Sequence, residues 1–278
     1  MPPASSWSPV EADLKTILKE YPDPLRALAE ARVPAFILRR AYAPAHCQGL
    51  IRRFIERGLM RDPQDTSGKD TRNRIDIGTS LGNLGGNQEH FLQHAEGTHQ
   101  LFAHLFDGFD NPVQTLYTAL QALALSQEVK VAREPDGRRY GPAIFRIHYT
   151  GHTYRPHIDH VVLREERFNY AVSRFAHQFA GVLCFQNASA QGESTQAILH
   201  QCLWTPQIQP HIAAQTFPQY AAENHLAQCR VELEPGDLYF FNTRCIHEVP
   251  PVQGGLPRIV LASFIGYGPE HREVFVWS

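Results

Sequence analysis

The chain has 278 residues, of which 43% are hydrophobic and 19% charged, and its formal net charge is −2. This is the composition of an ordinary globular protein, and the interspersed charges argue against a basic surface for nucleic acid or an anionic membrane. We therefore expect a small-molecule substrate, with neither nucleic acid nor a membrane as partner.

The cysteines are few and scattered. There are five of them, without any Cys-x-x-Cys pair, which argues against a disulfide framework or a zinc ribbon. We find no basic segment followed by an apolar run near the amino end, and no run of about eighteen apolar residues. We therefore expect a cytoplasmic protein, and its oligomeric state stays open, with a homodimer among the candidates.

The first half of the sequence predicts mainly helices. Ser8-Pro9-Val10-Glu11 resembles a capping box with proline at the first helical position and predicts a helix to about Tyr21. Residues 62–73 are polar and residues 78–87 carry four glycines, which predicts a long loop of the kind that closes over a substrate. Apolar periodicity predicts a strand over residues 33–38 and helices over residues 44–58, 88–106 and 112–126.

The second half predicts strands, because short runs of β-branched and aromatic residues alternate with turn signals such as Pro235-Gly236-Asp237. Many short strands behind a helical half predict an α+β protein with a jelly-roll or barrel core and supporting helices on one side. We expect one domain over residues 1–278, with helical support and a substrate loop in 1–130 and the β core in 131–278. The predicted strands cover residues 143–149, 157–163, 179–186, 196–203, 230–233, 237–241, 258–267 and 273–277.

Two His-x-acid sequences are possible parts of a metal site. With 15 histidines and 28 acidic residues, about one or two such pairs arise by chance, so their structural context decides. His94-Ala95-Glu96 lies in a segment of helical periodicity, where residues i and i+2 face different sides, and we interpret it as a solvated helix surface. His157-Ile158-Asp159 opens a predicted strand, where residues i and i+2 share a face and both reach one metal ion.

His247 is the best third ligand, since it follows an aromatic strand at a point where the chain is expected to turn. His157, Asp159 and His247 offer two imidazoles and one carboxylate. This leaves three positions of an octahedral metal open for a co-substrate and dioxygen, as in the facial triad of non-haem Fe(II) oxygenases. Zinc accepts the same ligands, so the ligand set alone leaves a metallohydrolase open.

Arg258 lies eleven residues after His247 and alternates with apolar residues along a predicted strand. Its planar guanidinium matches a carboxylate through two hydrogen bonds. One interpretation is an anchor for a carboxylate co-substrate inside the barrel, and the other is an arginine at a strand start that pairs with a surface acid. Combined with the metal ligands, the pattern favours the anchor.

These four residues resemble the motif of the Fe(II)/2-oxoglutarate-dependent oxygenase superfamily, in which His-x-Asp is followed by a distal His and then an Arg. The similarity is closest to one branch, the free-standing hydroxylases of N-substituted amino acids together with carrier-independent alkaloid halogenases. The similar stretches are PDGRRYGPAIFRIHYTGHTYRPHIDH, EPGDLYFFNTRCIHEV and REVFVWS. With a weaker similarity over residues 34–58, the resemblance spans most of the chain from about residue 33.

The resemblance implies a double-stranded β-helix fold, Fe(II) as cofactor and 2-oxoglutarate as co-substrate, which is decarboxylated to succinate and CO₂ while dioxygen hydroxylates an unactivated C–H bond. It implies that Arg258 anchors 2-oxoglutarate and that Arg146, which matches an arginine of the branch, lines the 2-oxoglutarate or substrate pocket. A structural salt bridge is the competing interpretation for Arg146. Many members carry serine where this chain has Val260, so a hydroxyl contact to 2-oxoglutarate must come from elsewhere. The halogenases have glycine in place of Asp159, which favours hydroxylation.

The substrate is expected to be amino-acid-like or to carry a carboxylate. The glycine-rich loop corresponds to a region that closes over substrate in the branch, so we expect substrate contacts from Arg74, Ile77, Thr79 and Leu81, and from Arg164 after the metal motif. Exposed arginines are usually only solvated, which is the competing interpretation for Arg74 and Arg164. Three other functions stay open: a 2-oxoglutarate-dependent oxidase or desaturase of another natural product, a cupin-like metalloenzyme that does not use 2-oxoglutarate, and a catalytically silent jelly-roll binding protein.

Overall fold

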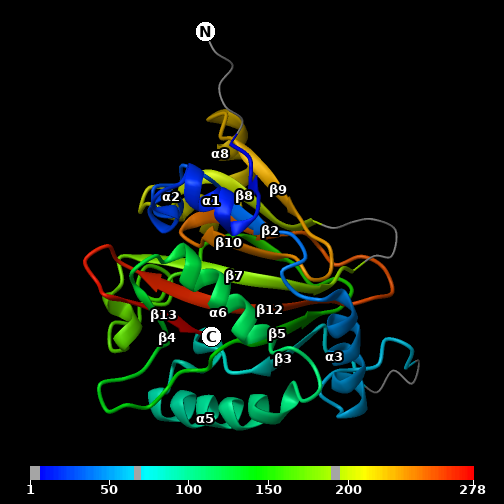
Figure 1. The fold of residues 1–278 in the computed structure, drawn as a ribbon. Helices are drawn as coiled ribbons and strands as arrows, with labels where there is room; N and C mark the ends of the chain where they lie inside the picture. The colour runs from blue at the N-terminus through cyan, green and yellow to red at the C-terminus, as the bar shows by residue number, and fades with distance from the viewer. Residues whose placement is uncertain (1–6, 66–69, 189–194) are drawn as a thin grey trace.

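The computed structural model describes residues 7–65, 70–188 and 195–278. Its strands form two sheets, a larger and a smaller one (Figure 1). In chain order the strands are β1 (Val10–Glu11), β2 (Ala35–Leu38), β3 (Arg74–Gly78), β4 (Glu128–Val131), β5 (Ile144–His148), β6 (Tyr154–His157), β7 (His177–Gln186), β8 (Thr195–Leu203), β9 (Gln228–Glu232), β10 (Leu238–Asn242), β11 (Cys245–Val249), β12 (Arg258–Tyr267) and β13 (Glu273–Trp277).

The larger sheet has the strand order β1-β2-β10-β7-β12-β13-β4, and the smaller sheet has the order β6-β11-β8-β9. Strand β12 is long enough to carry two neighbours on one edge. Its first half, from Arg258 to Ala262, pairs with β5, and its second half pairs with β13. Strand β5 pairs in turn with β3, so that β3, β5 and β12 form one continuous surface beside the cavity described below.

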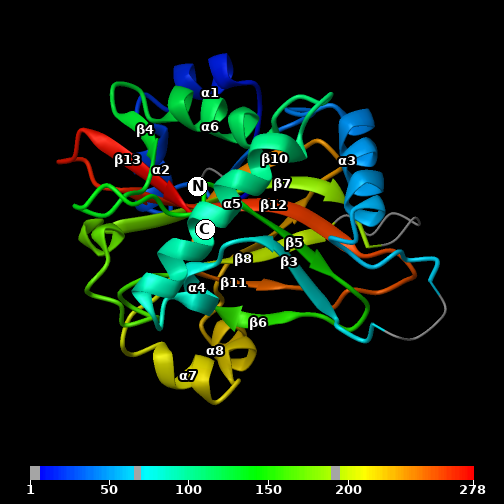
Figure 2. The same ribbon diagram turned by 90° about the horizontal axis from the view of Figure 1, so that it is seen from below.

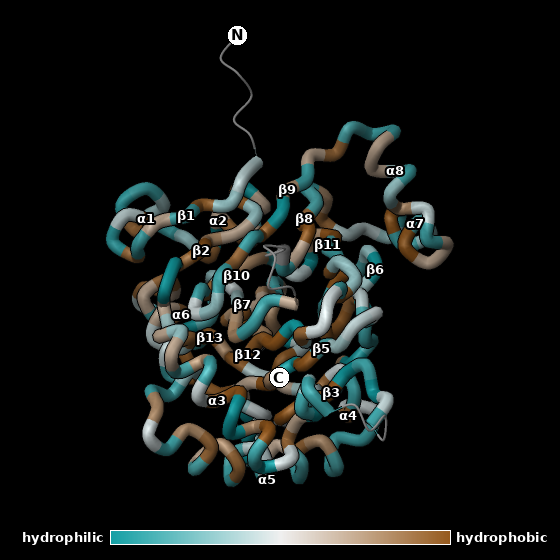
Figure 3. The backbone as a smooth tube through the Cα atoms, turned by 90° about the vertical axis from the view of Figure 1, so that its right-hand side faces the viewer, coloured by the Kyte–Doolittle hydropathy of each residue, from teal (hydrophilic) through white to brown (hydrophobic). Residues whose placement is uncertain are grey.

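Both faces of the larger sheet are buried. Successive side chains of a strand point to opposite faces, so its central strands each contribute residues to two core clusters. In β10, Phe240 packs against the helices, whereas Tyr239 and Phe241 pack against the smaller sheet. In β7, Leu183 and Val182 divide between the two faces in the same way. Hydrophobic residues therefore concentrate along the central strands (Figure 3), and the protein has three layers: helices, larger sheet and smaller sheet.

Helices cover the outer face of the larger sheet. The long ones are α3 (Pro44–Glu56), α5 (Gln88–Leu105) and α6 (Pro112–Leu123), which lie over this face in Figures 1 and 2. Phe145 of β5 anchors this layer, with its ring centroid 4.8 Å from that of Phe54 and 6.0 Å from that of Phe102. Within the described ranges, no helix combines the length and apolar character that a membrane span needs. The shorter helices are α1 (Leu14–Glu20), α2 (Pro24–Ala29), α4 (Leu81–Leu84), α7 (Gln209–Ala213) and α8 (Phe217–Glu223), with a 3₁₀ turn at Ala171–Arg174.

Most of the predicted elements are confirmed apart from their end residues. The helices predicted over residues 44–58, 88–106 and 112–126 correspond to α3, α5 and α6. Asn87 and Asn111 cap α5 and α6 by accepting hydrogen bonds from backbone N–H groups of the first turn. The strands predicted over residues 33–38, 143–149, 179–186, 196–203, 230–233, 237–241, 258–267 and 273–277 correspond to β2, β5, β7, β8, β9, β10, β12 and β13.

Three predictions of local structure are wrong. Residues 8–21 do not form one helix, because Val10–Glu11 pairs with β2, and α1 begins only after Asp13, whose side chain caps it. Residues 157–163 are not a strand, because β6 ends at His157 and the chain then turns. The loop expected between residues 62 and 87 contains β3 and α4. The elements β4, β11, α2, α7 and α8 have no counterpart among the predicted ones.

Candidate active site

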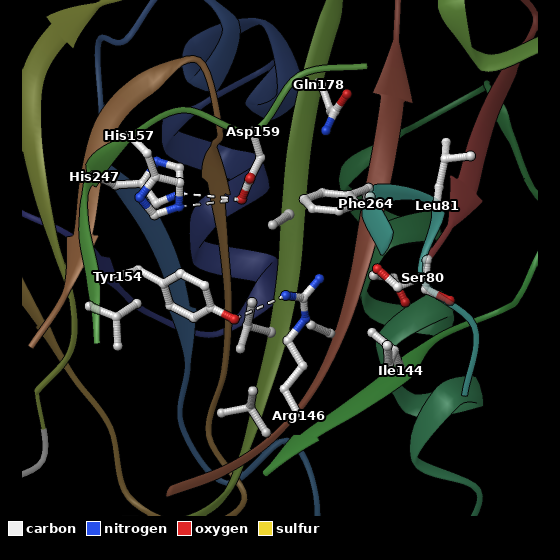
Figure 4. A pocket seen from close by; sticks show the side chains of 18 of the residues that line it. Ser80, Leu81, Ile144, Arg146, Tyr154, His157, Asp159, Gln178, His247 and Phe264 are labelled. Atoms are coloured by element: carbon white, nitrogen blue, oxygen red, sulfur yellow. Dashed lines mark hydrogen bonds and ion pairs between the residues drawn. The ribbon is translucent and has the colours of Figure 1, made fainter. Parts of the chain in front are cut away.

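A cavity of about 270 Å³ lies between the two sheets. The larger sheet lines it with residues of β3, β5, β7, β10, β12 and β13, and the smaller sheet with residues of β6, β8 and β11. Helix α4 and the turn of residues 158–167 complete the wall. Figure 4 shows two imidazoles and a carboxylate on one side of this cavity, and Ser80, Leu81, Ile144 and Phe264 on the other.

The imidazoles and the carboxylate belong to His157, His247 and Asp159. His157 and His247 lie opposite each other in the pairing of β6 with β11. Asp159 follows the end of β6 and is held by Thr243: the Asp159 N–H donates to the Thr243 carbonyl at 3.0 Å, and the Thr243 hydroxyl donates to the Asp159 carbonyl at 2.6 Å. One ligand atom from each of the three residues lies within 4.8 Å of the others. Strand pairing and a turn bring them together, and not the shared face of one strand that we expected.

Both histidines are oriented by backbone carbonyls. His157 Nδ1 lies 2.7 Å from the carbonyl oxygen of Arg155, and His247 Nδ1 lies 2.9 Å from that of Cys245. Because a carbonyl oxygen only accepts, each Nδ1 carries the proton and each Nε2 keeps its lone pair. The Nε2 atoms of His157 and His247 lie 3.8 and 3.5 Å from Oδ2 of Asp159 (Figure 4). This is the tautomer and orientation that metal-binding histidines adopt.

The protonation states also suit a divalent metal. Burial, together with the neighbouring His247, lowers the pKa of His157 to about 4, so its imidazole is neutral at neutral pH. Burial opposes the ionisation of Asp159, but its interactions with His247, His157 and Arg164 together outweigh burial and hold the pKa of this carboxyl below its usual value. A neutral imidazole and a carboxylate are the forms that bind a metal. The three residues therefore fit a metal ion with two nitrogen ligands and one oxygen ligand.

Arg258 is a buried cation among neutral partners. It is the first residue of β12 and is 6% exposed. Its Nε donates to Oε1 of Gln196 at 2.7 Å, and its terminal nitrogens donate to Nδ1 of His148 at 3.2 Å and to the Gln196 carbonyl at 3.3 Å. Within the described part of the chain, no carboxylate pairs with this guanidinium. Burial of an unpaired charge is costly. An anionic ligand that binds beside Arg258 would offset this cost.

Arg146 is a second guanidinium in the cavity. It lies directly opposite Asp76 in the pairing of β5 with β3. The carboxylate of Asp76 is already taken, because it accepts from Arg74 at 2.9 and 2.6 Å and from the Asn83 amide at 3.2 Å. Among described residues, the hydrogen-bond partner of the Arg146 guanidinium is the Tyr154 hydroxyl, at 3.4 Å (Figure 4). Arg146 therefore has donors to spare for an anion.

The residues expected to contact substrate divide into two groups. Arg74, Leu81 and Arg164 line the cavity. Ile77 and Thr79 do not, so the prediction that these two residues contact substrate is wrong. Ile77 is on the face of β3 that packs into the hydrophobic core below the helices, and Thr79 is fully buried with its hydroxyl 2.8 Å from Nδ1 of His94 on α5. The alternation of side chains along β3 directs Arg74 and Ile77 to opposite sides.

Several cavity residues were not anticipated from the sequence. Gln178 lines the cavity (Figure 4) and accepts a hydrogen bond from the Val161 N–H at 2.9 Å. Tyr154, three residues before His157, is another. One sequence signal was available for Gln178, since it is polar at the start of an otherwise apolar strand. The other His-x-acid pair, His94 and Glu96, lies exposed on α5 as expected.

Comparisons with known proteins identify a matching family model and two structures of similar fold. The family model described as "Carrier-protein-independent halogenase WelO5" matches residues 7–278. Two solved structures of an N-substituted L-amino acid dioxygenase from Burkholderia ambifaria AMMD are similar at 13% identity, each covering 92% of this chain and 90% of the other. The TM-score is 0.60 for the structure in complex with alpha-KG and 0.56 for the other, which establishes a shared fold. A search of curated protein sequences gave no significant match.

Proposed function

We propose that this chain, which belongs to the family of the carrier-protein-independent halogenase WelO5 within the Fe(II)/2-oxoglutarate-dependent oxygenase superfamily, is a dioxygenase that hydroxylates an unactivated C–H bond. Its substrate is a small, amino-acid-like or carboxylate-bearing molecule, and succinate and CO₂ are the co-products. One observation carries the proposal: the ligand set of His157, Asp159 and His247 faces the same cavity as Arg258, a buried cation without a carboxylate partner.

Fe(II) is held by His157, Asp159 and His247 in this proposal. Bound iron supplies the activation of dioxygen, and the residues supply the geometry that keeps part of its coordination sphere open. The carbonyls of Arg155 and Cys245 fix the two imidazoles, and Thr243 fixes the main chain of Asp159. The three ligands therefore need little rearrangement to bind the metal.

2-Oxoglutarate carries a carboxylate at each end, and the cavity offers two guanidiniums. We assign Arg258 to the carboxylate that is remote from the metal, since Arg258 is the more deeply buried of the two arginines. We assign Arg146 to the part of 2-oxoglutarate that lies nearer the metal. Tyr154 is placed to supply the hydroxyl contact that Val260 lacks, because its OH lies 3.4 Å from both Arg146 NH1 and His148 Nε2. The alpha-KG complex of the similar Burkholderia dioxygenase supports a ligand of this kind in the shared fold.

Hydroxylation is favoured over halogenation by Asp159. Its Oδ2 is directed towards Nε2 of both histidines, so a carboxylate occupies the position that the halogenases of the branch leave to a halide by carrying glycine. A side chain that is itself a metal ligand competes with chloride for that position. We infer that oxygen, and not halide, is transferred to the substrate.

We also propose that the two sheets form a double-stranded β-helix and that residues 1–278 are one domain. Strands β1 and β2 come from the first part of the chain, yet they extend the sheet that contains β10, β7 and β12. The hydrophobic core below this sheet likewise combines residues of α1, α3 and α6 with residues of β5, β7 and β12. Residues 1–130 and 131–278 therefore share one core.

The test is turnover of a panel of amino acids and N-substituted amino acids with Fe(II), 2-oxoglutarate, labelled dioxygen and chloride. We expect succinate release that depends on the substrate, and a product that has gained one labelled oxygen atom. A chlorinated product would make the protein a halogenase, and a product that has lost two hydrogens would make it a desaturase. Product without succinate would favour a metalloenzyme that does not use 2-oxoglutarate.

A further inference from the structure

The two oxygens of the Asp159 carboxylate have different surroundings. Oδ2 is directed towards Nε2 of His157 and His247, as described above, whereas Oδ1 accepts a hydrogen bond from NH1 of Arg164 at 2.5 Å. The same Arg164 nitrogen donates to the carbonyl of Ile158 at 2.8 Å. Arg164 therefore fixes the rotation of the carboxylate and leaves a single oxygen for the metal position.

Ion pairs and hydrogen bonds connect Arg164 to α4, on the opposite wall of the cavity. Its Nε lies 3.9 Å from Oε1 of Glu165, and the other oxygen of Glu165 lies 3.2 Å from NH1 of Arg167. Arg167 then donates from NH1 to the carbonyl of Leu81 at 2.6 Å and from NH2 to that of Gly82 at 3.0 Å. Leu81 and Gly82 belong to α4 and line the cavity. A continuous chain of ion pairs and hydrogen bonds thus runs from α4 to Asp159.

Backbone hydrogen bonds and close packing hold together the segment that carries this chain. The turn after Asp159 is closed by backbone hydrogen bonds from Arg164 N to His160 O at 3.1 Å and from Arg167 N to Val161 O at 3.0 Å. The guanidinium of Arg167 also packs closely against α4, since a Cβ built on Gly85 would lie 2.8 Å from its Nε and Cζ. Arg167 therefore links α4 directly to the turn that follows Asp159.

We propose that Arg164 is a positioning residue for Asp159 and that Glu165 and Arg167 couple it to α4, so that the cavity wall at α4 influences how firmly Asp159 holds its metal. A charge-assisted hydrogen bond to one oxygen of a ligating carboxylate restrains it to bind through the other oxygen. This keeps coordination positions open for other ligands. The inference rests on the proposed function, because it takes Asp159 as a metal ligand.

The experiment is a titration of the purified protein with Co(II), followed by visible absorption, for wild type, Arg164→Met and Arg164→Lys. Loss of an outer hydrogen-bond partner typically weakens metal binding about 10–100-fold, so we expect Arg164→Met to raise the Kd for Co(II) by that factor and Arg164→Lys to raise it less. Arg138→Met is the matched control, since Arg138 is as exposed as Arg164, pairs with the carboxylates of Asp136 and Glu89 and does not line the cavity. Circular dichroism checks that each variant is folded.

The coupling to α4 is tested by a double-mutant cycle with Arg167→Met, and with Glu165→Gln as a second variant that preserves side-chain size. We expect each to weaken Co(II) binding less than Arg164→Met does, and to add nothing once Arg164 is already Met, because both act through it. An unchanged Kd in Arg164→Met, or strictly additive effects, would overturn the inference while wild type still binds Co(II). Wild type that binds no Co(II) would instead overturn the proposed function.

Discussion

The guanidinium of Arg258 donates to Nδ1 of His148 at 3.2 Å, across the pairing of β12 with β5. Burial, followed by the charge of Arg258 itself, lowers the pKa of His148 well below its ordinary value, so the imidazole stays neutral and accepts this bond. A neutral acceptor orients the guanidinium without neutralising it. The pair therefore preserves a full positive charge in the cavity for an anionic ligand.

The first prediction concerns this charge. Arg258→Lys keeps the cation but loses the planar fork, and Arg258→Met loses both. We expect Arg258→Met to weaken 2-oxoglutarate binding by at least about 30-fold, which corresponds to about 2 kcal/mol for a buried charged hydrogen bond, and Arg258→Lys to lie between it and wild type. Anaerobic calorimetric titration of the metal-loaded protein with 2-oxoglutarate measures the effect. Equal affinity for Arg258→Met and wild type would exclude Arg258 as the anchor.

The Tyr154 hydroxyl gives a second prediction. It lies 3.4 Å from both Arg146 NH1 and His148 Nε2, so Tyr154→Phe removes one neutral hydrogen-bonding group without changing the shape of the cavity. We expect 2-oxoglutarate to bind about 2–10-fold more weakly, in line with about 0.5–1.5 kcal/mol for such a bond, while the Kd for Co(II) stays unchanged. Tyr117→Phe is the control, because that hydroxyl donates to the carbonyl of Pro142 and does not line the cavity. A loss of metal binding in Tyr154→Phe would argue for a structural role.

The third prediction is a dependence of stability on pH. His148 and His152 stack with their ring centroids 4.1 Å apart. The pKa of His148 is well below its ordinary value, and burial, with the charge of Arg74, lowers the pKa of His152 to about 4. Unfolding returns both to about 6.5. Because the unfolded chain then binds more protons than the folded one, the free energy of unfolding decreases as the pH falls from about 6.5 towards 4.

Urea unfolding of the metal-free protein at pH 7.5 and 5.5 measures this dependence. Each histidine changes the free energy of unfolding by at most about 1.4 kcal/mol per pH unit. Between pH 7.5 and 5.5, the free energy of unfolding of His148→Gln should therefore fall by up to about 1.4 kcal/mol less than that of wild type. Glutamine keeps an acceptor for Arg258 but does not titrate. The same loss in both proteins would show that His148 is not held neutral in the folded state.

The fourth prediction separates the core from the cavity. Phe145 and Arg146 are neighbours on β5 and point to opposite faces of the sheet, Phe145 into the ring cluster with Phe54 and Phe102 and Arg146 into the cavity. We expect Phe145→Ala to lower the free energy of unfolding by about 3–5 kcal/mol, whereas Arg146→Met should change it by less than about 1 kcal/mol and weaken 2-oxoglutarate binding instead. Denaturant melts and ligand titrations of both variants provide the comparison. A reversed ranking of the two variants in the melts would mean that the assignment of faces is wrong.

The elements with strong periodicity were predictable from the sequence, and those that depend on tertiary pairing were not. The helix α5 and the strand β12 follow from local patterns and caps. The short strands β1 and β11 have too few residues for a periodic signal and exist because β2, β6 and β8 pair with them. The strand predicted over residues 157–163 is wrong for a related reason, since its apolar residues pack in a turn: Val161 joins a core cluster with Tyr170 and Trp277.

The same distinction holds for the candidate site. The candidate ligands and the candidate anchor could be chosen from the sequence, because their chemistry, predicted strand context and order along the chain form a motif: His157, Asp159, His247 and Arg258. The wall of the cavity depends on register, which spacing in the sequence does not define. A shift of one residue moves a side chain from one face of a strand to the other, which is why the loop pattern suggested Ile77 although the structure directs it into the core.

We propose that one cavity binds iron through His157, Asp159 and His247, and 2-oxoglutarate through Arg258. The most direct measurement is the visible absorption of the anaerobic protein with Fe(II) and 2-oxoglutarate, recorded for wild type, Asp159→Ala and Arg258→Met. We predict a weak charge-transfer band for wild type, which is lost in Asp159→Ala and needs far more 2-oxoglutarate in Arg258→Met. Absence of the band from wild type at saturating 2-oxoglutarate, or an undiminished band in Asp159→Ala, would contradict this assignment of the metal ligands and the 2-oxoglutarate site.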